Sequence, residues 1–565
     1  MTMEPPTNSL VQPLLTDLYQ ITMTYAYWRN NRHNEFAVFE LFFRKNPFKG
    51  AFTIFCGLDE VVKHLHAFKF SQEDVDYLKS CPSFLDCDPD FFDYLLSLDC
   101  SQVQIQALPH GSLAFPRVPL VIVSGPLALG QLLETTLLTL INYPSLLATN
   151  AARMVMQAQD HDNIRFPDQN KNEIPTQCTK TPKCIEFGLR RAQGPDGGFS
   201  ASKYSFIGGF AATSNVLAGK QLGIPISGTH AHAFVQSYLS LDEVKDLTLL
   251  DQKTKKRVSL VSKVLEYRNN TNGSDLGTEY QHTNDGELAA YIAYACAFPD
   301  TFLALVDTYD TLTSGLLNFC LVALVLDDLG YVPKGIRLDS GDLAHLSMAC
   351  AKKWAELAET LNRPFFRDLD IVASNDINEK ILIELNQTGH AITVYGIGTN
   401  LVTCQAQPAL GCVYKLVELS GTPRLKLSQD AAKVLIPGRK RAYRLFGKDG
   451  KPLVDLMIEA DKEDPPVEGK PVLCRNPFEE RDRVLVTPSK VVLLHRLYFD
   501  GGKEAEDTVT SLEETKAFVL EQLNNPSPRL LHYHDPIQYP VMVSDALYKF
   551  LHQMWMDQLH IKELS

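Results

Sequence analysis

The sequence predicts a mixed α/β fold: an irregular, TIM-like α/β barrel, together with an α+β sheet or sandwich domain built from the N- and C-terminal segments. Seven apolar runs of strand length between residues 184 and 400 each end in a cluster of small, polar or charged residues. Helical stretches at residues 342–361 and 378–387 separate the last of these runs. Such alternation forces a parallel sheet with right-handed crossovers. Strand-like segments before and after this block predict the second domain.

The seven runs are residues 185–187, 204–207, 224–226, 302–306, 334–338, 369–373 and 392–395. In a parallel barrel, the residues that follow the C-terminal ends of the strands build the active site. The polar clusters after these runs therefore contain the candidate site residues. A doubly wound sheet is the alternative fold, and it is disfavoured because no Gly-x-Gly-x-x-Gly opens an early helix.

The segment before the barrel mixes short strands with helices. Four segments predict short elements, namely strands at residues 36–43 and 51–55 and helices at residues 71–78 and 89–98. Ser71 is the expected N-cap of the first helix. Closely spaced leucines over residues 129–140 predict a buried helix that ends before Asn142-Tyr143-Pro144.

The segment after the barrel contains hairpin-like runs, at residues 411–417, 424–427, 442–446 and 484–492. We expect this segment to return to the N-terminal sheet. The predicted organisation is an α+β domain over residues 1–148, whose entry helix carries Tyr19, a catalytic barrel over residues 149–404, and the returning segment over residues 405–565. Residues 159–183 are rich in Asn, Asp, Lys and Pro and predict a mobile surface insertion.

The composition is that of a soluble globular protein, with 45% hydrophobic and 21% charged residues among 565. A net charge of −13 without a long basic run argues against general binding to nucleic acid or to acidic membranes. The N-terminus lacks the features of a signal peptide, and polar residues interrupt residues 118–141 too often for a membrane span. The 12 cysteines show no disulfide framework, so reduced thiols and a cytoplasmic (cytosolic) location are expected.

Two strand-end clusters are candidates for binding phosphate and ribose. Gly396-Ile397-Gly398-Thr399 offers backbone N–H groups without obstructing side chains, although many such turns bind nothing. Asp339-Ser340-Gly341-Asp342 places two carboxylates around a turn, which suits ribose hydroxyls or a metal–phosphate group. The competing interpretation is that Asp339 or Ser340 caps the following helix. We expect a functional role for Asp339, whereas function and structure are equally plausible for Asp342.

Three arginines lie in or directly after predicted strands. Arg337 is inside an apolar strand, where an unpaired charge would cost on the order of several kcal/mol, so it should face a carboxylate or an anionic ligand. Arg190 and Arg191 follow another strand. A guanidinium can bind phosphate or carboxylate through two parallel hydrogen bonds, but arginine pairs beside strands are often only solvated.

A histidine loop, Gly228-Thr229-His230-Ala231-His232, follows the run at residues 224–226. A neutral imidazole at a strand end can act as base, acid or phosphoryl acceptor. The commoner alternative is a structural histidine held by backbone carbonyls. The sequence contains no Gly-x-x-x-x-Gly-Lys-Ser/Thr loop, so any use of ATP does not rest on a Walker-type cradle.

At these residues the chain closely resembles the nicotinate phosphoribosyltransferases of the animal type, in the type II phosphoribosyltransferase superfamily, over nearly its full length. The matching segments are LLTDLYQ at residues 14–20, FELFFR at 39–44, EFGLRRAQGPDGG at 186–198, GTHAH at 228–232, RLDSGD at 337–342 and GIGT at 396–399. Several independent motifs in the family's order argue against a chance match.

The resemblance implies the first step of nicotinate salvage to NAD, in which nicotinate and 5-phosphoribosyl 1-pyrophosphate give nicotinate mononucleotide and pyrophosphate. It also implies coupling to hydrolysis of ATP, a co-substrate, through a transient phosphohistidine. The family's Gly-Thr-x-Ala-His pattern places that modification on His232, and no catalytic role is expected for His230. The resemblance further implies a homodimer and Mg²⁺ or Mn²⁺ bridging the pyrophosphate.

On the phosphoribosyl side, the resemblance implies that Asp339 holds the ribose hydroxyls and Arg190 the phosphates of phosphoribosyl pyrophosphate. Gly396, Gly398 and Thr399 would bind the 5′-phosphate. The transition state should resemble an oxocarbenium ion, so positioning and charge stabilisation would supply most of the catalytic effect.

On the base side, the resemblance implies that Arg337 and Thr229 face the nicotinate carboxylate, and that Tyr19 contacts the pyridine ring across a dimer interface. Nicotinamide-using relatives place an aspartate in the segment corresponding to residues 213–216, where this chain has Ser214. An aspartate would repel a carboxylate substrate by on the order of a few kcal/mol in a shielded pocket. Ser214 therefore favours nicotinate.

Other functions fit the sequence less well. Nicotinamide phosphoribosyltransferase is disfavoured by Ser214. A catalytically silent scaffold that binds a nucleotide is disfavoured by the intact set of His232, Arg190, Arg337 and Asp339. A Schiff-base aldolase would need a lysine, and none follows the predicted strands.

Overall fold

A computed structural model of the chain describes residues 5–160, 176–271, 273, 276–426, 433–503, 505, 509–526 and 528–558. The chain falls into two compact units, one of Met1–Asn150 with Ala406–Ser565 and one of Ala151–Gln405. The sequence placed the corresponding boundaries after residues 148 and 404. Residues 161–175, the central part of the predicted insertion, lie outside the described residues.

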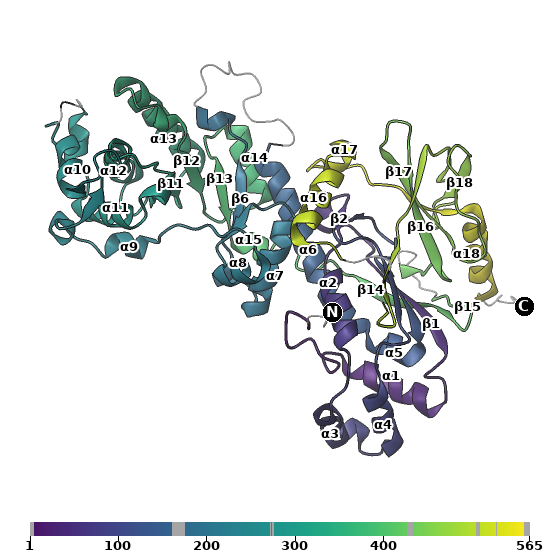
Figure 1. Cartoon of the computed structure of the whole chain (residues 1–565). Coiled ribbons are helices and arrows are strands. Elements are labelled where there is room, and N and C mark those ends of the chain that lie inside the picture. The colour runs from purple at the N-terminus through teal and green to yellow at the C-terminus, as the bar shows by residue number, and fades with distance from the viewer. Residues whose placement is uncertain are drawn as a thin grey trace, which may run out of the picture. The chain divides into compact units, whose positions relative to one another are not determined.

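The first unit contains a six-stranded antiparallel sheet to which both ends of the chain contribute (Figure 1). Its strands, in spatial order, are β15 (Thr422–Pro423), β14 (Val413–Leu419), β1 (Phe36–Phe42), β5 (Val121–Pro126), β3 (Gln104–Ala107) and β21 (Arg496–Asp500). In the middle of this sheet, Ala37 of β1 pairs with Leu419 of β14 on one side and with Gly125 of β5 on the other. Strands β14, β15 and β21 of the C-terminal segment thus belong to the same sheet as the N-terminal strands.

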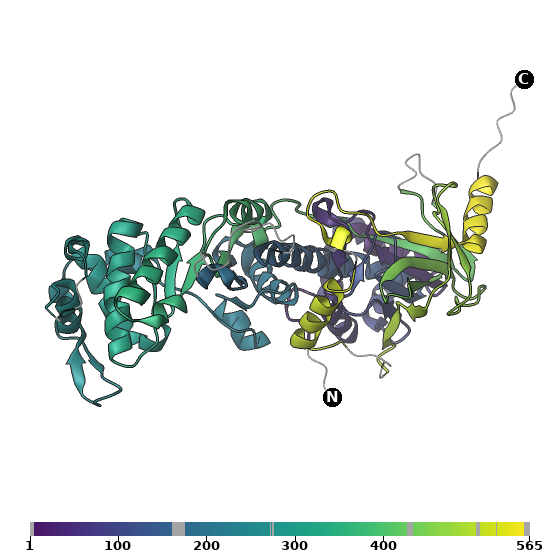
Figure 2. The same ribbon diagram turned by 90° about the horizontal axis from the view of Figure 1, so that it is seen from above.

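A second six-stranded sheet lies wholly in the C-terminal segment. Its strands, in spatial order, are β19 (Arg483–Val486), β18 (Val472–Arg475), β22 (Val541–Ser544), β17 (Pro452–Glu459), β16 (Lys440–Phe446) and β20 (Lys490–Leu493). The two edge strands, β19 and β20, are consecutive in the chain. The link from Val486 to Lys490 spans at most about 14 Å, whereas six flat strands would be about 24 Å wide. The sheet must therefore curl strongly. Figure 2 gives a second view of its strands, which are drawn in green to yellow.

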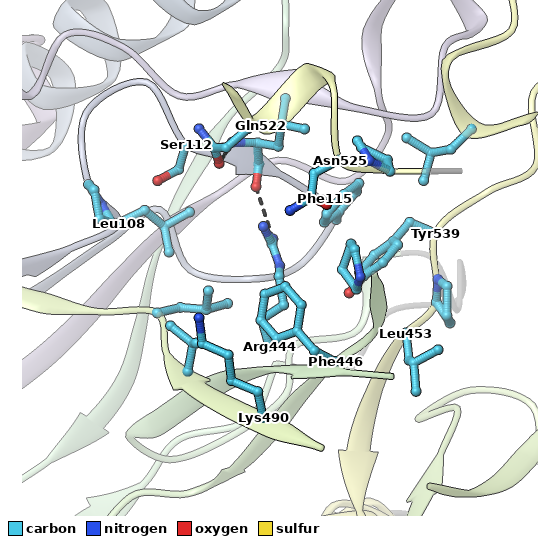
Figure 3. Close-up of a pocket in the computed structure, with 18 of the residues that line it drawn as sticks. Leu108, Ser112, Phe115, Arg444, Phe446, Leu453, Lys490, Gln522, Asn525 and Tyr539 are labelled. Carbon is cyan, nitrogen blue, oxygen red and sulfur yellow. Dashed lines mark hydrogen bonds between the residues drawn. The ribbon is translucent and has the colours of Figure 1, made fainter. Parts of the chain in front are cut away.

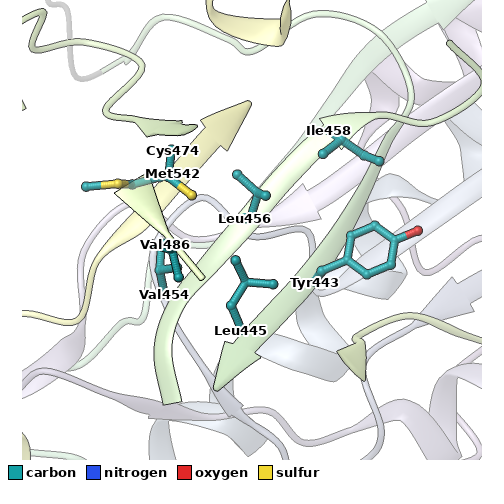
Figure 4. Packing of buried hydrophobic residues seen from close by; sticks show 8 residues of the cluster. All are labelled: Tyr443, Leu445, Val454, Leu456, Ile458, Cys474, Val486 and Met542. Carbon is teal, nitrogen blue, oxygen red and sulfur yellow. The ribbon is translucent and has the colours of Figure 1, made fainter. Parts of the chain in front are cut away.

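One face of this sheet holds a compact apolar core (Figure 4). Alternate residues of β17, Val454, Leu456 and Ile458, point into it because successive side chains of a strand face opposite sides. Met542 comes from the neighbouring strand β22, and Cys474 comes from β18 beyond it. Each fully buried large apolar side chain contributes about 1.5–3 kcal/mol, so this cluster alone is a substantial stabilising core.

The first unit also contains α-helices. They are α1 (Leu18–Arg29), α2 (Leu58–Ala67), α3 (Gln72–Ser80), α4 (Pro89–Ser97), α5 (Leu127–Leu132), the first part of α6 (Glu134–Ala158), α16 (Leu512–Leu523), α17 (Pro528–Leu531) and α18 (Asp545–Gln558). Both short helices predicted near the N-terminus are confirmed. Ser71 accepts a hydrogen bond from the Asp74 N–H in a reciprocal capping box. The short strands β2 (Thr53–Ile54) and β4 (Leu113–Ala114) pair with each other.

The predicted end of the leucine-rich helix before Pro144 is wrong, because α6 continues through this proline. A proline inside a helix has no N–H for the carbonyl four residues earlier, here Leu140. Gly57 packs against that carbonyl so closely that a Cβ at this position would lie 1.9 Å from the Leu140 oxygen. Side chains on the following turns, Ser145 and Thr149, accept hydrogen bonds from the N–H groups of Cys56 and Ile54. Packing against this backbone segment therefore supports the helix across its missing bond.

The second unit is built on a parallel six-stranded sheet. Its strands, in spatial order, are β10 (Leu303–Leu305), β11 (Gly335–Leu338), β12 (Asp370–Ala373), β13 (Val394–Ile397), β6 (Lys183–Glu186) and β7 (Ala212–Thr213). Its helices are α7 (Gly194–Ile207), α8 (Val216–Leu222), α9 (His232–Gln236), α10 (Leu260–Arg268), α11 (Asp285–Ala297), α12 (Leu316–Asp328), α13 (Leu343–Thr360), α14 (Glu379–Thr388) and α15 (Thr399–Val402). The predicted α/β class and parallel sheet are confirmed.

One of the seven predicted strands is wrong, and another, at residues 224–226, contributes only a single bridge at Ile226. Residues 204–207 form the last turn of α7, and the strand that joins the sheet is the shorter β7. All residues from Ala201 to Ile207 are buried. A short apolar run that is buried on every side has no periodicity that separates a helix from a strand.

Within the described residues, the parallel strands form an open sheet. A single bridge from Thr213 to Ile226 extends the sheet beyond β7. Among the described residues, no strand pairing joins Ile226 to β10. A side chain fills part of this gap: the Leu305 N–H of β10 donates a hydrogen bond to His230 Nε2 at 3.2 Å. Closure into a complete barrel stays a prediction.

Helix α12 is the most apolar helix of the second unit. With the turn that precedes it, Thr311–Asp328 is long and apolar enough to cross a bilayer by length and composition alone. However, 72% of this segment is buried inside the unit, and every residue from Leu316 to Leu326 is buried. A helix that is apolar on all sides is expected in the core of a large domain.

Candidate active site

Two adjoining cavities lie at the C-terminal ends of the parallel strands in the second unit. The smaller has a volume of about 120 Å³ and the larger about 390 Å³. The smaller cavity is lined by Phe187, Arg190, Arg191, Arg337, Asp339, Ser374, Asn375, Asp376, Gly396, Gly398 and Thr399. The larger cavity is lined by Phe187, Leu189, Arg190, Ser214, Gly228, Thr229 and Arg337. Because three residues line both, the two cavities form one continuous site.

Arg337 of β11 lies between the two cavities. Its Nε donates to Ser374 Oγ at 2.7 Å, its Nη1 to Thr229 Oγ1 at 2.8 Å and its Nη2 to Asp339 Oδ1 at 2.8 Å. Its guanidinium carbon lies 5.5 Å from the centroid of the Phe187 ring. The predicted carboxylate partner of this arginine is therefore Asp339, and the guanidinium is held in a fixed orientation.

Asp339 presents its two carboxylate oxygens to different surroundings. Oδ1 accepts hydrogen bonds from Arg337 and, at 2.6 Å, from Ser374 Oγ. Oδ2 lies 3.8 Å from Nε2 of His232. One oxygen therefore anchors the carboxylate, while the other is positioned to accept a hydrogen bond from a ligand.

The N-cap of α13 is Asp342, which accepts a hydrogen bond from the His345 N–H at 3.0 Å. The capping interpretation therefore holds for Asp342, and neither Asp339 nor Ser340 is the cap. Ser340 instead donates to Asp307 Oδ2 at 2.5 Å.

The two neighbouring arginines after β6 differ in their contacts. Arg191 Nη1 donates to Thr399 Oγ1 at 3.1 Å and lies 3.6 Å from a carboxylate oxygen of Asp376. In the described part of the chain, the Arg190 guanidinium has no hydrogen bond or ion pair, and it lines both cavities. Its charge is thus the one available to a ligand.

Gly396 and Gly398 flank the smaller cavity on β13 and the turn that follows. A Cβ at Gly396 would lie 2.4 Å from the Phe187 ring, so glycine at this position makes room for that ring. At Gly398 a Cβ would meet the Phe187 carbonyl at 3.3 Å. The two glycines let β13 and the end of β6 approach closely, and Phe187 becomes the wall shared by both cavities.

The larger cavity is suited to an anionic group. Its lining contains two arginines and no carboxylate. Ser214 directly follows β7 and Thr229 lies in the histidine loop, so two further segments contribute uncharged polar groups. A planar acid entering this cavity would meet donors rather than a repelling charge.

A buried carboxylate organises the strand ends around this cavity. Glu186, at the end of β6, is fully buried and accepts hydrogen bonds from Ser202 Oγ at 3.0 Å, from Thr213 Oγ1 at 2.5 Å and from the Gly188 N–H. These bonds fix β7 and the Gly188 turn to β6. Glu186 therefore positions Ser214 and Arg190 without lining either cavity.

His232 stands at the start of α9 with 39% of its side chain exposed. Its Nδ1 lies 3.1 Å from Thr308 Oγ1. Its Nε2 lies 3.9 Å from Asp307 Oδ1 and 3.8 Å from Asp339 Oδ2. Within the described residues Asp307 Oδ1 is buried without a hydrogen-bond partner. One ring nitrogen is thus engaged, and the other faces two carboxylates.

His230 is a structural histidine. Its Nε2 accepts the Leu305 N–H, and its ring packs against Tyr294 with the centroids 4.9 Å apart. Burial lowers the pKa of His230 to about 4, so it stays neutral at ordinary pH. The expectation that His230 has no catalytic role agrees with this environment.

Three family models match the chain. The nicotinate phosphoribosyltransferase N-terminal domain matches residues 14–142, the nicotinate phosphoribosyltransferase family residues 182–443, and the C-terminal domain residues 439–551. The chain belongs to the nicotinate phosphoribosyltransferase family.

Relatives and solved structures of this family align over almost the whole chain. Nicotinate phosphoribosyltransferase 1 of Arabidopsis thaliana is 48% identical over 99% of this chain and 96% of its own length. The Homo sapiens nicotinate phosphoribosyltransferase is 43% identical over 96% of this chain and 97% of its own length. A crystal structure of the human enzyme matches with a TM-score of 0.81 and 41% identity, covering 95% of this chain and 99% of that one.

The structure brings together all but one of the predicted site residues. Nine of them lie in the second unit, at or beside the two cavities: Arg190, Ser214, Thr229, His232, Arg337, Asp339, Gly396, Gly398 and Thr399. Tyr19 lies in the first unit, on α1, and is 46% exposed.

Several site residues were not predicted. Phe187 is the last residue of the predicted strand at 185–187, and Ser374, Asp307 and Thr308 belong to the polar clusters after the runs at 369–373 and 302–306. Their position at strand ends was the available signal. No group of three or more His, Cys, Asp or Glu side chains suited to a metal ion occurs among the residues described.

Proposed function

We propose that this chain catalyses transfer of the phosphoribosyl group from 5-phosphoribosyl 1-pyrophosphate to the ring nitrogen of nicotinate. The products are nicotinate mononucleotide and pyrophosphate. The observation that carries the proposal is the paired cavity, in which an anion-binding pocket without carboxylates adjoins a polar cavity through Arg190 and Arg337. Membership of the family supports the same reaction.

The geometry supports a division of labour in this reaction. The smaller cavity would hold the ribose through Asp339 Oδ2 and the 5′-phosphate at the turn of Gly398 and Thr399. The larger cavity would hold nicotinate, with its ring beside Phe187 and its carboxylate near Arg337 and Thr229. The attacking ring nitrogen would then face the anomeric carbon, and positioning of two bound reactants can lower the barrier by about 7–11 kcal/mol.

We further propose that ATP phosphorylates His232 on Nε2. Thr308 occupies Nδ1, which leaves Nε2 as the open nitrogen. In this step the Nε2–P bond forms as the bond from the γ-phosphorus to the bridging oxygen breaks, releasing ADP. Water later cleaves the N–P bond and releases phosphate. A phosphoryl group here would add negative charge beside Asp339 and so couple ATP hydrolysis to substrate and product binding.

The proposed reaction includes Mg²⁺ or Mn²⁺, which would neutralise the charge that develops on departing pyrophosphate. The carboxylate oxygens of Asp339 and Asp376 line the smaller cavity and are ligands suited to such a hard cation. Since the described residues offer no three-residue metal cluster, the pyrophosphate oxygens would supply most of the ligands.

We propose a homodimer in which Tyr19 contacts the base bound by the partner subunit. Tyr19 and the neighbouring Leu18 and Leu15 are 46%, 57% and 37% exposed in the single chain. Contiguous exposed apolar residues on one segment are typical of an interface. A cavity of about 420 Å³ is lined by Asp17 and Tyr19 together with residues of α6.

A radiolabelled assay with nicotinate and with nicotinamide tests the proposal. Each reaction contains phosphoribosyl pyrophosphate and Mg²⁺, with and without ATP, and the His232→Ala variant is assayed beside the wild type. We expect mononucleotide from nicotinate only, and stimulation by ATP only when His232 is present.

Each part of the proposal has its own contradicting result. Preference for nicotinamide would overturn the assignment of the base. Undiminished ATP stimulation in His232→Ala would overturn the phosphohistidine. Absence of turnover with either base in a folded protein would overturn the enzyme activity itself.

A further inference from the structure

A cavity of about 430 Å³ in the first unit is not part of the proposed active site (Figure 3). Segments far apart in the sequence enclose it: residues 108–115, β16, β20, α16 and the residues before β22. Its volume is within the range of about 300–1,000 Å³ typical of small-molecule sites.

The walls of this cavity are mainly apolar and aromatic. Phe115, Phe446, Phe518 and Tyr539 contribute rings, and Phe115 and Tyr539 stack with their centroids 3.9 Å apart. Leu453 remains 42% exposed at the cavity. Apolar side chains left accessible around a concave site are a common feature of ligand-binding surfaces.

A buried arginine lies at the centre of the cavity. Arg444 Nε and Nη2 each donate to an Asp455 oxygen at 2.8 Å, and Nη2 also donates to the Leu113 carbonyl at 2.9 Å. The guanidinium also lies over the Phe115 ring, 5.1 Å from its centroid. These bonds engage Nε and Nη2, and the side chain of Tyr539 also interacts with the guanidinium. Arg444 lines the cavity, and Nη1 is the guanidinium nitrogen outside the Asp455 and Leu113 bonds.

Further positive charge surrounds the cavity. Lys490 is exposed, and its Nζ lies 5.5 Å from the centroid of the Phe446 ring. No described acidic side chain pairs with Lys490. Arg496 adds a second basic group, and Glu521 is the one acidic residue among the described residues of the lining. The charge balance favours an anion over a cation.

We propose that this cavity binds a small organic molecule with an apolar body and one acidic group, such as a hydrophobic carboxylate or sulfonate. The apolar body would lie between the aromatic rings and the aliphatic side chains of the wall. The acidic group would accept hydrogen bonds from Arg444 Nη1 and face Lys490. The site is independent of the proposed phosphoribosyl transfer.

Fluorescence titration of the full-length protein with 1-anilinonaphthalene-8-sulfonate tests this site directly. The dye combines an apolar ring system with one sulfonate, and its emission rises when water is excluded from it. We expect saturable binding, and displacement of the dye by decanoate at least about fivefold more effective than by 1-decanol, since only decanoate carries the charge.

Two variants, each with a matched control, test whether the dye binds in this cavity. Val492→Trp fills it from β20, and should abolish the saturable signal, whereas Val484→Trp on the exposed edge strand β19 should not. Lys490→Glu should weaken dye binding by about fivefold, whereas Lys470→Glu, an exposed lysine outside the lining with the same change of charge, should not. Circular dichroism and the melting temperature establish that each variant is folded.

These measurements test the location of the binding site and the chemical class of its ligand separately. Unchanged dye binding in folded Val492→Trp would overturn the proposed site. Equal displacement by decanoate and 1-decanol, or an equal effect of Lys490→Glu and Lys470→Glu, would overturn the preference for an acidic ligand.

Discussion

At the scale of single residues, two features define the larger cavity, where the base is proposed to bind: its positive charge and the absence of a carboxylate from its lining. Arg190 and Arg337 supply positive charge, and the lining of the larger cavity includes no carboxylate. An aspartate at the position of Ser214 would introduce a carboxylate. Charge at this single position therefore controls whether the pocket accepts an anionic or a neutral base.

The Ser214→Asp variant is predicted to lose nicotinate turnover selectively. A carboxylate facing the bound acid should lower kcat/KM for nicotinate on the order of a hundredfold, equivalent to roughly 3 kcal/mol. Steady-state kinetics with both bases measure the change. Ser214→Asn is the matched control, because asparagine is nearly the same size as aspartate but carries no charge. If both variants lose the same activity, the effect is steric and the electrostatic argument fails.

The sequence predicted a site residue well where a charged side chain lay inside an apolar strand. Arg337 inside an apolar strand required a partner, and the partner is Asp339. Phe187 and Ser374 carried no such signal, because a phenylalanine and a serine after a strand are ordinary. Their roles come from the alignment of β6, β12 and β13 in the folded sheet, which places them against Arg337.

At the scale of elements, length and burial decided which predictions held. The parallel strands at residues 335–338, 370–373 and 394–397 were predictable because polar clusters marked their ends. The last turn of α7 was predicted as a strand because its residues are buried on all sides. Helix α6 passes Pro144 because contacts with residues 54–57 replace the local bond, and local sequence does not encode such distant contacts.

The Gly57→Ala variant is predicted to be strongly destabilised. Gly57 has a φ of 99°, and a Cβ there would overlap the Leu140 carbonyl. The backbone strain alone costs about 1–2 kcal/mol, and displacement of α6 adds to it. The midpoint of urea unfolding measures the loss. Gly450→Ala is the control, because its φ is 75° with no atom within 4 Å of the added Cβ. Equal losses in both variants would show that the Leu140 contact contributes nothing.

At the scale of the whole molecule, the proposed dimer makes a quantitative prediction. Tyr19→Ala and Arg337→Ala should each be inactive as homodimers, since each lacks part of every site. Mixing them through unfolding and refolding should restore about a quarter of wild-type activity, because half of the dimers are mixed and each has one intact site. The assay is mononucleotide formation from nicotinate. Activity that stays at the level of the separate variants would place Tyr19 outside the partner's site.

Acid should destabilise the protein through its buried histidines. Burial lowers the pKa values of His64, His230 and His495 to about 4 from an ordinary value of 6.5. Between pH 6.5 and 4 the unfolded chain binds more protons than the folded one at these sites. Their contribution to stability is therefore complete above pH 6.5 and declines as the pH falls, by up to about 1.4 kcal/mol per pH unit for each histidine.

The His64→Leu variant isolates one of these contributions. Its melting temperature should fall less than that of the wild type between pH 6.5 and pH 5, because one buried group no longer takes up a proton on unfolding. Thermal melts at several pH values measure the difference. Parallel pH profiles for the two proteins would assign the acid sensitivity to other groups.

The central sheet of the first unit combines strands from both ends of the chain, and this arrangement determines the order in which the two units are completed during translation. Strand β1 lies between β5, which ends at Pro126, and β14, which begins at Val413. At about 5–20 residues per second, synthesis of the intervening segment takes roughly 15–60 s. During that interval the nascent chain exposes an unpaired strand edge, while the strands of the catalytic unit emerge and can pair among themselves. Translation therefore completes the catalytic unit before the central sheet of the unit to which Tyr19 belongs.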